Sequence, residues 1–111
     1  MVSKTDYVEV TTKEEWDQAI KEGKGVIVRS GIWEAYGSSY VKAHNSSYVN
    51  AHDSSKVTAH DLSVVEAHDS SYVNAHDSSK VNAHDSSYVK AHDSSKVYAH
   101  DSSVVIKTKT G

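Results

Sequence analysis

The chain has 111 residues, with 12 basic and 15 acidic side chains and a formal net charge of −3, which argues against a basic nucleic-acid-binding surface. It has no cysteine, so nothing points to a disulfide framework, a thiol redox role or a thiolate metal site. The length predicts one domain, and we find neither a signal-peptide core nor a run approaching the ~18 apolar residues of a membrane span.

The first elements predicted along the chain are a strand and a helix. Residues 7–10 alternate as a short strand, and Thr12 and Glu15 then form a capping-box pattern that opens a helix over residues 12–22. Trp16, Ala19 and Ile20 share one face of this helix, and Gly23 suits the position just beyond its end. The segment therefore reads as one short amphipathic helix.

A second strand is predicted at residues 25–28, and residues 29–36 resemble a degenerate copy of the repeat described next, with Trp33 and Ala35 at its apolar positions. We interpret residues 1–36 as an N-terminal cap, because the first coil of a repeat array exposes core and strand edges unless a terminal unit covers them. The alternative is that this segment binds a ligand or a partner.

Residues 37–106 consist of nine copies of an octapeptide, Asp-Ser-Ser-x-Val-x-Ala-His, of which residues 69–76 are a typical copy. The Val and Ala of each copy are two apart, so they share a face of an extended strand, and the second Ser is in phase with them. A helix fits badly, because a period of eight drifts away from the 3.6-residue turn. The pattern predicts a mainly β protein: a single parallel β-solenoid whose copies pair along the coil axis.

The corner of each coil is predicted at the first position of the octad, which is Gly37, Asn45 and then Asp in every later copy. Gly, Asn and Asp are the residues that best tolerate left-handed backbone. If one such residue bends the chain by about a right angle, three octads form a coil. The handedness expected for parallel crossovers is right-handed.

Two coil sizes are compatible with the repeat. A 24-residue, three-sided coil is preferred, because it stacks Glu66 between Lys42 and Lys90. A flat, two-sided roll of 16 residues is the alternative, and it places Glu66 between Asn50 and Asn82.

The last residues, 107–111, are predicted to be a polar tail in which Lys107 and Lys109 discourage edge-to-edge growth. Tyr98, Val104 and Ile106 are unusually apolar for outward positions. They favour either a homo-oligomer formed through an uncapped C-terminal end or, equally, a truncated or engineered terminus.

The repeat resembles the octapeptide-repeat β-helix segments of bacterial and phage surface-type proteins, in which Ser-Ser-x-Val-x-Ala is followed by an aromatic residue or His and then Asp, Gly or Asn. The resemblance covers residues 37–105 and implies a fold, but no activity. The near identity of the copies also suggests an idealised or engineered sequence.

Histidine ends eight octads, and stacked imidazoles one rung apart could share a divalent ion. A straight column offers two or three ligands in line and not a tetrahedral set, so these residues are only weak candidates for a metal site. In the three-sided coil the columns would begin at His44, His52 and His60. The eight candidates are His44, His52, His60, His68, His76, His84, His92 and His100.

The recurrence of Ser, His and Asp invites a hydrolase interpretation, but His and Asp are sequence neighbours at a bend and no unique pocket is implied. We therefore expect a structural repeat scaffold with no catalytic residues, no cofactor, and no nucleic-acid or membrane partner. Two alternatives remain: an adhesion or recognition module that uses the Tyr and Lys outer faces, and a metal- or pH-responsive assembly that uses the stacked histidines.

Overall fold

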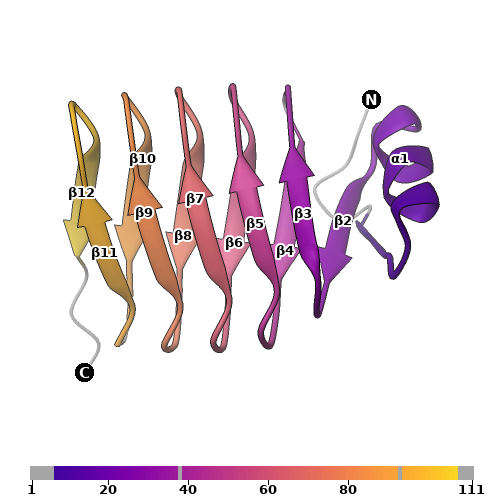
Figure 1. Ribbon diagram of the computed structural model, residues 1–111, viewed down its shortest axis with the longest axis horizontal. Helices are drawn as coiled ribbons and strands as arrows, with labels where there is room; N and C mark the ends of the chain where they lie inside the picture. Colours follow the sequence, from indigo (N-terminus) through magenta and orange to yellow (C-terminus); the bar gives the residue numbers. More distant parts are fainter. Residues whose placement is uncertain (1–6, 38, 93, 108–111) are drawn as a thin grey trace.

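The computed structural model describes residues 7–37, 39–92 and 94–107, and in these residues the chain is a parallel β-solenoid with one short helix at its N-terminal end. Figure 1 shows a rod in which two sheets lie back to back, with successive coils running from the helix to the opposite end. No helix in the described part of the chain is both long and apolar enough to span a membrane.

The N-terminal elements are β1 (Tyr7–Glu9), α1 (Lys13–Lys21), β2 (Gly25–Val28) and β3 (Ile32–Ala35). Each octad then contributes one four-residue strand. These strands are β4 (Tyr40–Ala43), β5 (Tyr48–Ala51), β6 (Lys56–Ala59), β7 (Val64–Ala67), β8 (Tyr72–Ala75), β9 (Lys80–Ala83), β10 (Tyr88–Ala91), β11 (Lys96–Ala99) and β12 (Val104–Lys107).

Alternate strands belong to different sheets. Sheet A has the order β1-β2-β4-β6-β8-β10-β12, and sheet B has the order β11-β9-β7-β5-β3. Within each sheet, strands from the repeat pair in parallel with the strand 16 residues away, so that Val73 lies beside Val89 and Val65 beside Val81. One coil therefore consists of two octads, one in each sheet.

The preferred 24-residue coil is wrong, and the 16-residue alternative is confirmed. The reason lies in the corner. The amide of Ser55 donates to the carbonyl of His52 at 3.2 Å, and Asp53 between them has φ 60°, so the chain makes a complete β-turn where we expected a single-residue bend. Because a β-turn reverses the chain, two octads close a coil. Glu66 accordingly lies beside Asn50 and Asn82.

The left-handed residues fall at the predicted corner positions. Gly37 has φ 68°, and the described Asn and Asp residues that follow it at intervals of eight have φ between 57° and 60°. An L-residue pays about 1–2 kcal/mol for this conformation, least for Asn and Asp. The described non-glycine residues in this conformation are Asn45, Asp53, Asp61, Asp69, Asp77, Asp85 and Asp101.

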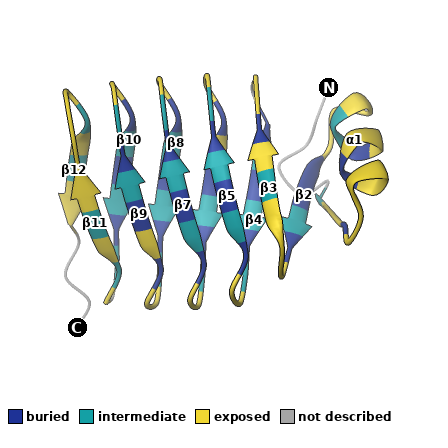
Figure 2. Cartoon of the chain, in the orientation of Figure 1, coloured by how far each residue is buried: buried dark blue, intermediate teal, exposed yellow. Residues whose placement is uncertain are grey.

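The core lies between the two sheets and is built from small side chains, as the alternation predicted. Figure 2 shows buried residues alternating with exposed or intermediate ones along the strands β4 to β10. The Val and Ala positions of β4 to β10 are buried, and so is the inward Ser that precedes each of these strands. Each inward hydroxyl is satisfied locally: Ser55 Oγ, for example, donates to the carbonyl of His52 at 2.8 Å. No described buried side-chain nitrogen or oxygen lacks a hydrogen-bond partner.

Helix α1 begins and ends as the sequence predicted. Thr12 and Glu15 form the reciprocal capping box. At the other end, Gly23 has φ 74°, and the amides of Gly23 and Lys24 donate to the carbonyls of Ile20 and Ala19, which is the Schellman arrangement.

The helix packs on the first coil through two tryptophans. Trp16 is 5% exposed and stacks on Trp33, with ring centroids 5.0 Å apart. Trp33 lies beside Val49 and Ala35 lies beside Ala51, so residues 29–36 do follow the register of the repeat. Strands β2 and β3 thus extend sheets A and B toward the helix.

Candidate functional site

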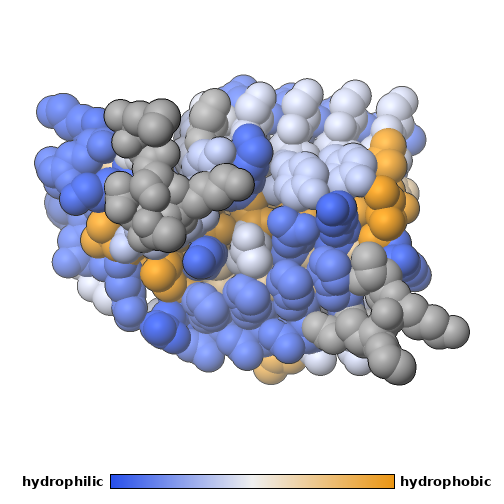
Figure 3. Space-filling model, turned by 180° about the vertical axis from the view of Figure 1, so that it is seen from behind, coloured by the Kyte–Doolittle hydropathy of each residue, from blue (hydrophilic) through white to orange (hydrophobic). Residues whose placement is uncertain are grey.

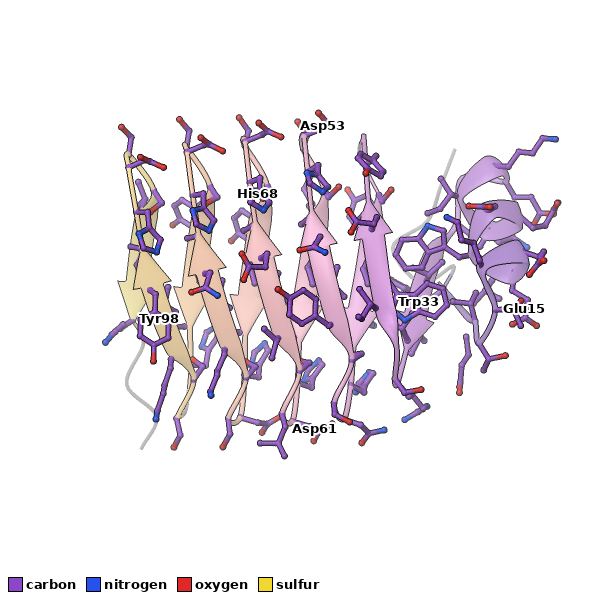
Figure 4. All side chains as sticks on the ribbon, in the orientation of Figure 1. Glu15, Trp33, Asp53, Asp61, His68 and Tyr98 are labelled. Atoms are coloured by element: carbon purple, nitrogen blue, oxygen red, sulfur yellow. The ribbon has the colours of Figure 1, made fainter. Side chains whose placement is uncertain are left out.

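The corner carboxylates form two columns, one along each edge of the rod. Figure 4 shows Asp53 at one edge and Asp61 at the other. We call these the first edge and the second edge. The first edge holds Gly37, Asp53, Asp69, Asp85 and Asp101; the second holds Asn45, Asp61 and Asp77.

Each corner carboxylate that the structure describes binds the backbone of the coil before it. Asp69 Oδ2 accepts the amide of Asp53 at 3.0 Å, and Asp61 Oδ2 accepts the amide of Asn45 at the same distance. The amide at a left-handed corner points along the coil axis and has no strand partner, so the side chain of the next coil supplies one. The carboxylates therefore join successive corners, and their first role is structural.

The histidines form two stacks of four and not the three columns expected from a 24-residue coil. Adjacent rings within a stack are nearly parallel, with centroids 4.5–5.2 Å apart. The stack at the first edge is His52, His68, His84 and His100; the stack at the second edge is His44, His60, His76 and His92.

The first-edge stack has glutamate partners on sheet B. His52 Nε2 lies 3.0 Å from Glu34 Oε1, and His84 Nε2 lies 3.4 Å from Glu66 Oε1. The hydrogen bond from His52 holds the pKa of Glu34 below its usual range, opposed by partial burial and assisted by the amide of Asn50 at 2.8 Å. These Glu–His contacts span 18 residues and follow only from a 16-residue coil, which is why the sequence interpretation missed them.

The second-edge stack has aspartate neighbours at longer distances. His44 Nδ1 lies 3.9 Å from Asp61 Oδ2, and His60 Nδ1 lies 3.8 Å from Asp77 Oδ2. Burial lowers the pKa of His60, and the positive charge that His44 can carry lowers it further, while Asp77 and Asp61 act in the opposite direction. At this site the desolvation of the imidazolium outweighs the neighbouring carboxylates.

The eight candidate metal ligands are brought into stacked rows. In the ranges 7–37, 39–92 and 94–107, no group of three or more His, Cys, Asp or Glu residues is arranged so that it could hold a metal ion. The hydroxyls of the inward serines are also engaged with the backbone, since each donates to the carbonyl of the histidine three residues before it at 2.7–2.9 Å.

The outer face of sheet A is rich in tyrosine and lysine. From β4 to β12 its outward positions carry three lysines and no carboxylate. Tyr72 stacks on Tyr88 with centroids 5.0 Å apart, and Lys56 Nζ lies 5.2 Å from the ring centroid of Tyr40. The outward residues are Tyr40, Lys42, Lys56, Thr58, Tyr72, Asn74, Tyr88, Lys90, Val104 and Ile106.

The outer face of sheet B carries an alternating row of Glu and Asn. Asn50 donates to Glu34 and Asn82 donates to Glu66, both at 2.8 Å. Tyr98 continues this row on β11, beside Asn82. The three apolar residues predicted to form an association patch are therefore divided between faces: Tyr98 lies on sheet B, whereas Val104 and Ile106 lie on sheet A.

An open hollow of about 470 Å³ lies where the helix meets the first coil. Ile20, Tyr36 and Tyr40 line it together with Lys24 and Ser39. Lys24 is already paired with Glu22 at 3.2 Å, so its charge is partly neutralised within the chain.

Comparison of the chain with protein-family models, with curated proteins and with solved structures finds no match.

Proposed function

We propose that this chain is a structural repeat scaffold, a short rigid rod that presents side chains at fixed intervals and has no catalytic activity. The observation that carries the proposal is the constancy of the register. Every strand of the repeat pairs with the strand 16 residues away, so outward positions recur at one coil spacing, which is about 4.8 Å.

Two further observations support a rigid rod. The interior is filled by Val, Ala and Ser that are almost completely buried, and close-packed interiors deform little. The corners are joined by carboxylate-to-amide hydrogen bonds in addition to the strand pairing, as between Asp69 and Asp53. The octads also resemble repeat segments of bacterial and phage surface-type proteins, and a scaffold role is compatible with that resemblance. A scaffold role is equally compatible with an engineered origin of the sequence.

A distance measurement between two spin labels tests this role. Ile32 and Lys96 both face outward on sheet B and are four coils apart, so labels on Ile32→Cys/Lys96→Cys should lie about 19 Å apart along the axis, with a narrow distribution. The chain has no other cysteine to label. A broad distribution would contradict the proposed rigid spacing.

Insertion of a second copy of residues 69–84 provides the matched control. It adds one coil between the labels, so the distance should increase by about 4.8 Å without broadening. An unchanged distance would mean that the inserted octads loop out and that the rod does not have an adjustable length.

A recognition role for the sheet A face is the second candidate, and its charge favours it. Lys42, Lys56 and Lys90 lie on a face that has no carboxylate between β4 and β12, although the whole chain has a net charge of −3. Such a face suits an anionic partner. Polygalacturonate, an anionic polysaccharide, is a suitable probe. Lys42→Gln/Lys90→Gln should reduce its binding, and Lys80→Gln/Lys96→Gln on sheet B should not.

A further inference from the structure

The outer edges of β11 and β12 are open in the part of the chain that the structure describes. β11 is the last strand of sheet B and β12 is the last strand of sheet A. The apolar columns become exposed at the same place: Val97 and Val105 are only half-buried and Ala99 is exposed, whereas Val81 and Val89 are completely buried. This end of the rod thus presents core side chains together with strand edges.

The unpaired backbone groups belong to defined residues. The amide of Lys96 donates to Ser79 at 3.0 Å and that of His100 donates to Ala83 at 2.8 Å, so these residues face β9. Because alternate residues of a strand direct their amides to opposite sides, Val97 and Ala99 face the open edge. The amide of Val104 donates to Ser87 at 2.9 Å, so Val105 faces the open edge of β12 in the same way.

The outward side chains of this coil are apolar as well. Tyr98 is 52% exposed on sheet B, and Val104 and Ile106 are 48% and 41% exposed on sheet A. Figure 3, which views the molecule from behind, shows hydrophobic atoms gathered at the end of the rod opposite the helix. Strand edges bordered by apolar side chains are ready to pair with another chain.

We propose that two copies of this chain associate through this coil, with β11 of each copy pairing in antiparallel orientation with β12 of the other. Successive octads are related by a half turn, so the edge of β12 lies about 2.4 Å beyond that of β11 along the axis. A two-fold axis parallel to the strands places the protruding edge of β12 in each copy over the recessed edge of β11 in the other. Both pairs of edges then meet at the same distance. A two-fold axis perpendicular to the sheets would pair β12 with its own copy and leave β11 unpaired.

The pairing has a favourable register. With Val97 opposite Val105 of the partner subunit, both residues direct their backbone groups at each other and both side chains face the core. Tyr98 then lies beside Val104 of the partner subunit on one outer face, and Lys96 lies beside Ile106 of the partner subunit. No like charges face each other in these pairs, and the apolar residues that one copy divides between its faces come together.

The assembly stops at two copies. At the opposite end of the rod, α1 covers the first coil, and Trp16 and Trp33 close the apolar column. Because a two-fold interface uses the same surface from both copies, the open edges of β11 and β12 are all used within the dimer. This inference deepens the proposed scaffold role, since it doubles the length of the rod. A monomeric chain would overturn the proposed dimer but not the scaffold role, because a monomer can still be rigid.

Disulfide trapping tests the register. Tyr98→Cys/Val104→Cys places cysteines at a facing antiparallel pair, whose Cβ atoms are about 4.5–5.5 Å apart, within reach of a disulfide after small adjustment. The chain has no other cysteine. We expect rapid oxidation to a covalent dimer, whereas Ile32→Cys/Val64→Cys, two outward positions of sheet B away from this coil, should remain monomeric. Equal rates of cross-linking in the two variants would overturn the proposed register.

Sedimentation of the unmodified chain tests the closed dimer. The mass should rise with concentration from 12.1 kDa to twice that value and then remain constant. Tyr98→Lys/Val104→Lys should sediment as a monomer with an unchanged circular dichroism spectrum, because both side chains are outward and half-exposed and facing lysines repel. A mass that stays at the monomer value, or one that continues to grow, would overturn the proposal.

Discussion

Asp69 accepts the backbone amide of Asp53, sixteen residues earlier, at 3.0 Å, while its own backbone adopts φ 60°. One residue thus performs two tasks at the corner, because its backbone makes the turn and its side chain binds the turn of the preceding coil. Glycine could make the turn but could not supply the carboxylate. This combination accounts for the preference for Asp at seven of the nine first positions.

Substitutions at Asp69 should separate these two tasks. Asp69→Asn keeps the tolerance for left-handed backbone and an acceptor oxygen, so its cost should be smallest. Asp69→Gly loses the hydrogen bond and adds unfolded-state freedom, about 1.5 kcal/mol in all. Asp69→Ala loses the bond and strains the backbone, about 2–3 kcal/mol. Urea denaturation would rank them, and an alanine variant as stable as the glycine variant would contradict the strain argument.

Trp16 should be the residue of α1 on which stability depends most. Its side chain is 5% exposed and stacks on Trp33, so Trp16→Ala should reduce the free energy of unfolding by roughly 3–5 kcal/mol. Asp17→Ala, one residue further on the exposed face, removes only a surface ion pair with Lys13 and should cost less than about 1 kcal/mol. Equal melting temperatures for the two variants would show that the helix does not protect the first coil.

Neighbouring positions on β8 should respond oppositely to a charge. Val73 is completely buried, so Val73→Asp places a carboxylate in the core and should unfold the middle of the array, at a cost of several kcal/mol. Tyr72 faces outward and stacks on Tyr88, so Tyr72→Asp should lose only about 1 kcal/mol. Circular dichroism melts of both variants provide the test, and the reverse order would contradict the register.

Acidification should destabilise the fold in the range where histidine titrates. The pKa of His60 is lowered by burial and by His44, so the unfolded chain binds the proton more readily. Stability should therefore fall as pH drops through the unfolded value of about 6.5. Thermal melts between about pH 7.5 and 5.0 in low salt measure this. A melting temperature that stays constant or rises would indicate that carboxylates such as Asp77, 3.8 Å from His60, compensate for the charge.

Two variants would locate that effect. His60→Gln removes an imidazole stacked between His44 and His76, and it should make the melting temperature less dependent on pH. His100→Gln makes the same chemical change at an exposed position and should have a smaller influence. If the two variants behaved alike, burial of His60 would not be the cause.

Much of this fold could be predicted from the alternation of residue types. The inward positions of Val73 and Ala75 follow from a period of two, and the corner at Asp69 follows from its tolerance for left-handed backbone. The capping box at Thr12 and Glu15 depends on residues close in sequence, so the start of the helix could be predicted equally well. Each of these features is decided within one octad or one turn of helix.

The coil size could not be decided in this way, because it depends on the angle through which each corner turns. That angle is set by the hydrogen bond from Ser55 to His52, which closes a β-turn that residue preferences alone do not specify. The wrong coil size also gave a wrong arrangement of the histidines. A 24-residue coil would stack His52 on His76, whereas the structure stacks it on His68 and places Glu34 at 3.0 Å. The wrong coil size thus gave each histidine the wrong stacking partner.

Because two octads form one coil, adding or removing an odd number of octads has a different result from adding or removing an even number. Because successive octads alternate between the sheets, removing a single copy, such as residues 61–68, would transfer every later strand to the opposite sheet. Tyr72 and Tyr88 would then exchange faces with Lys80 and Lys96, and the two edges would exchange their histidines. Removing two copies would shorten the rod and leave both faces as they are. Near-identical octads invite changes in copy number, so odd and even changes would produce molecules with different surfaces from the same repeat.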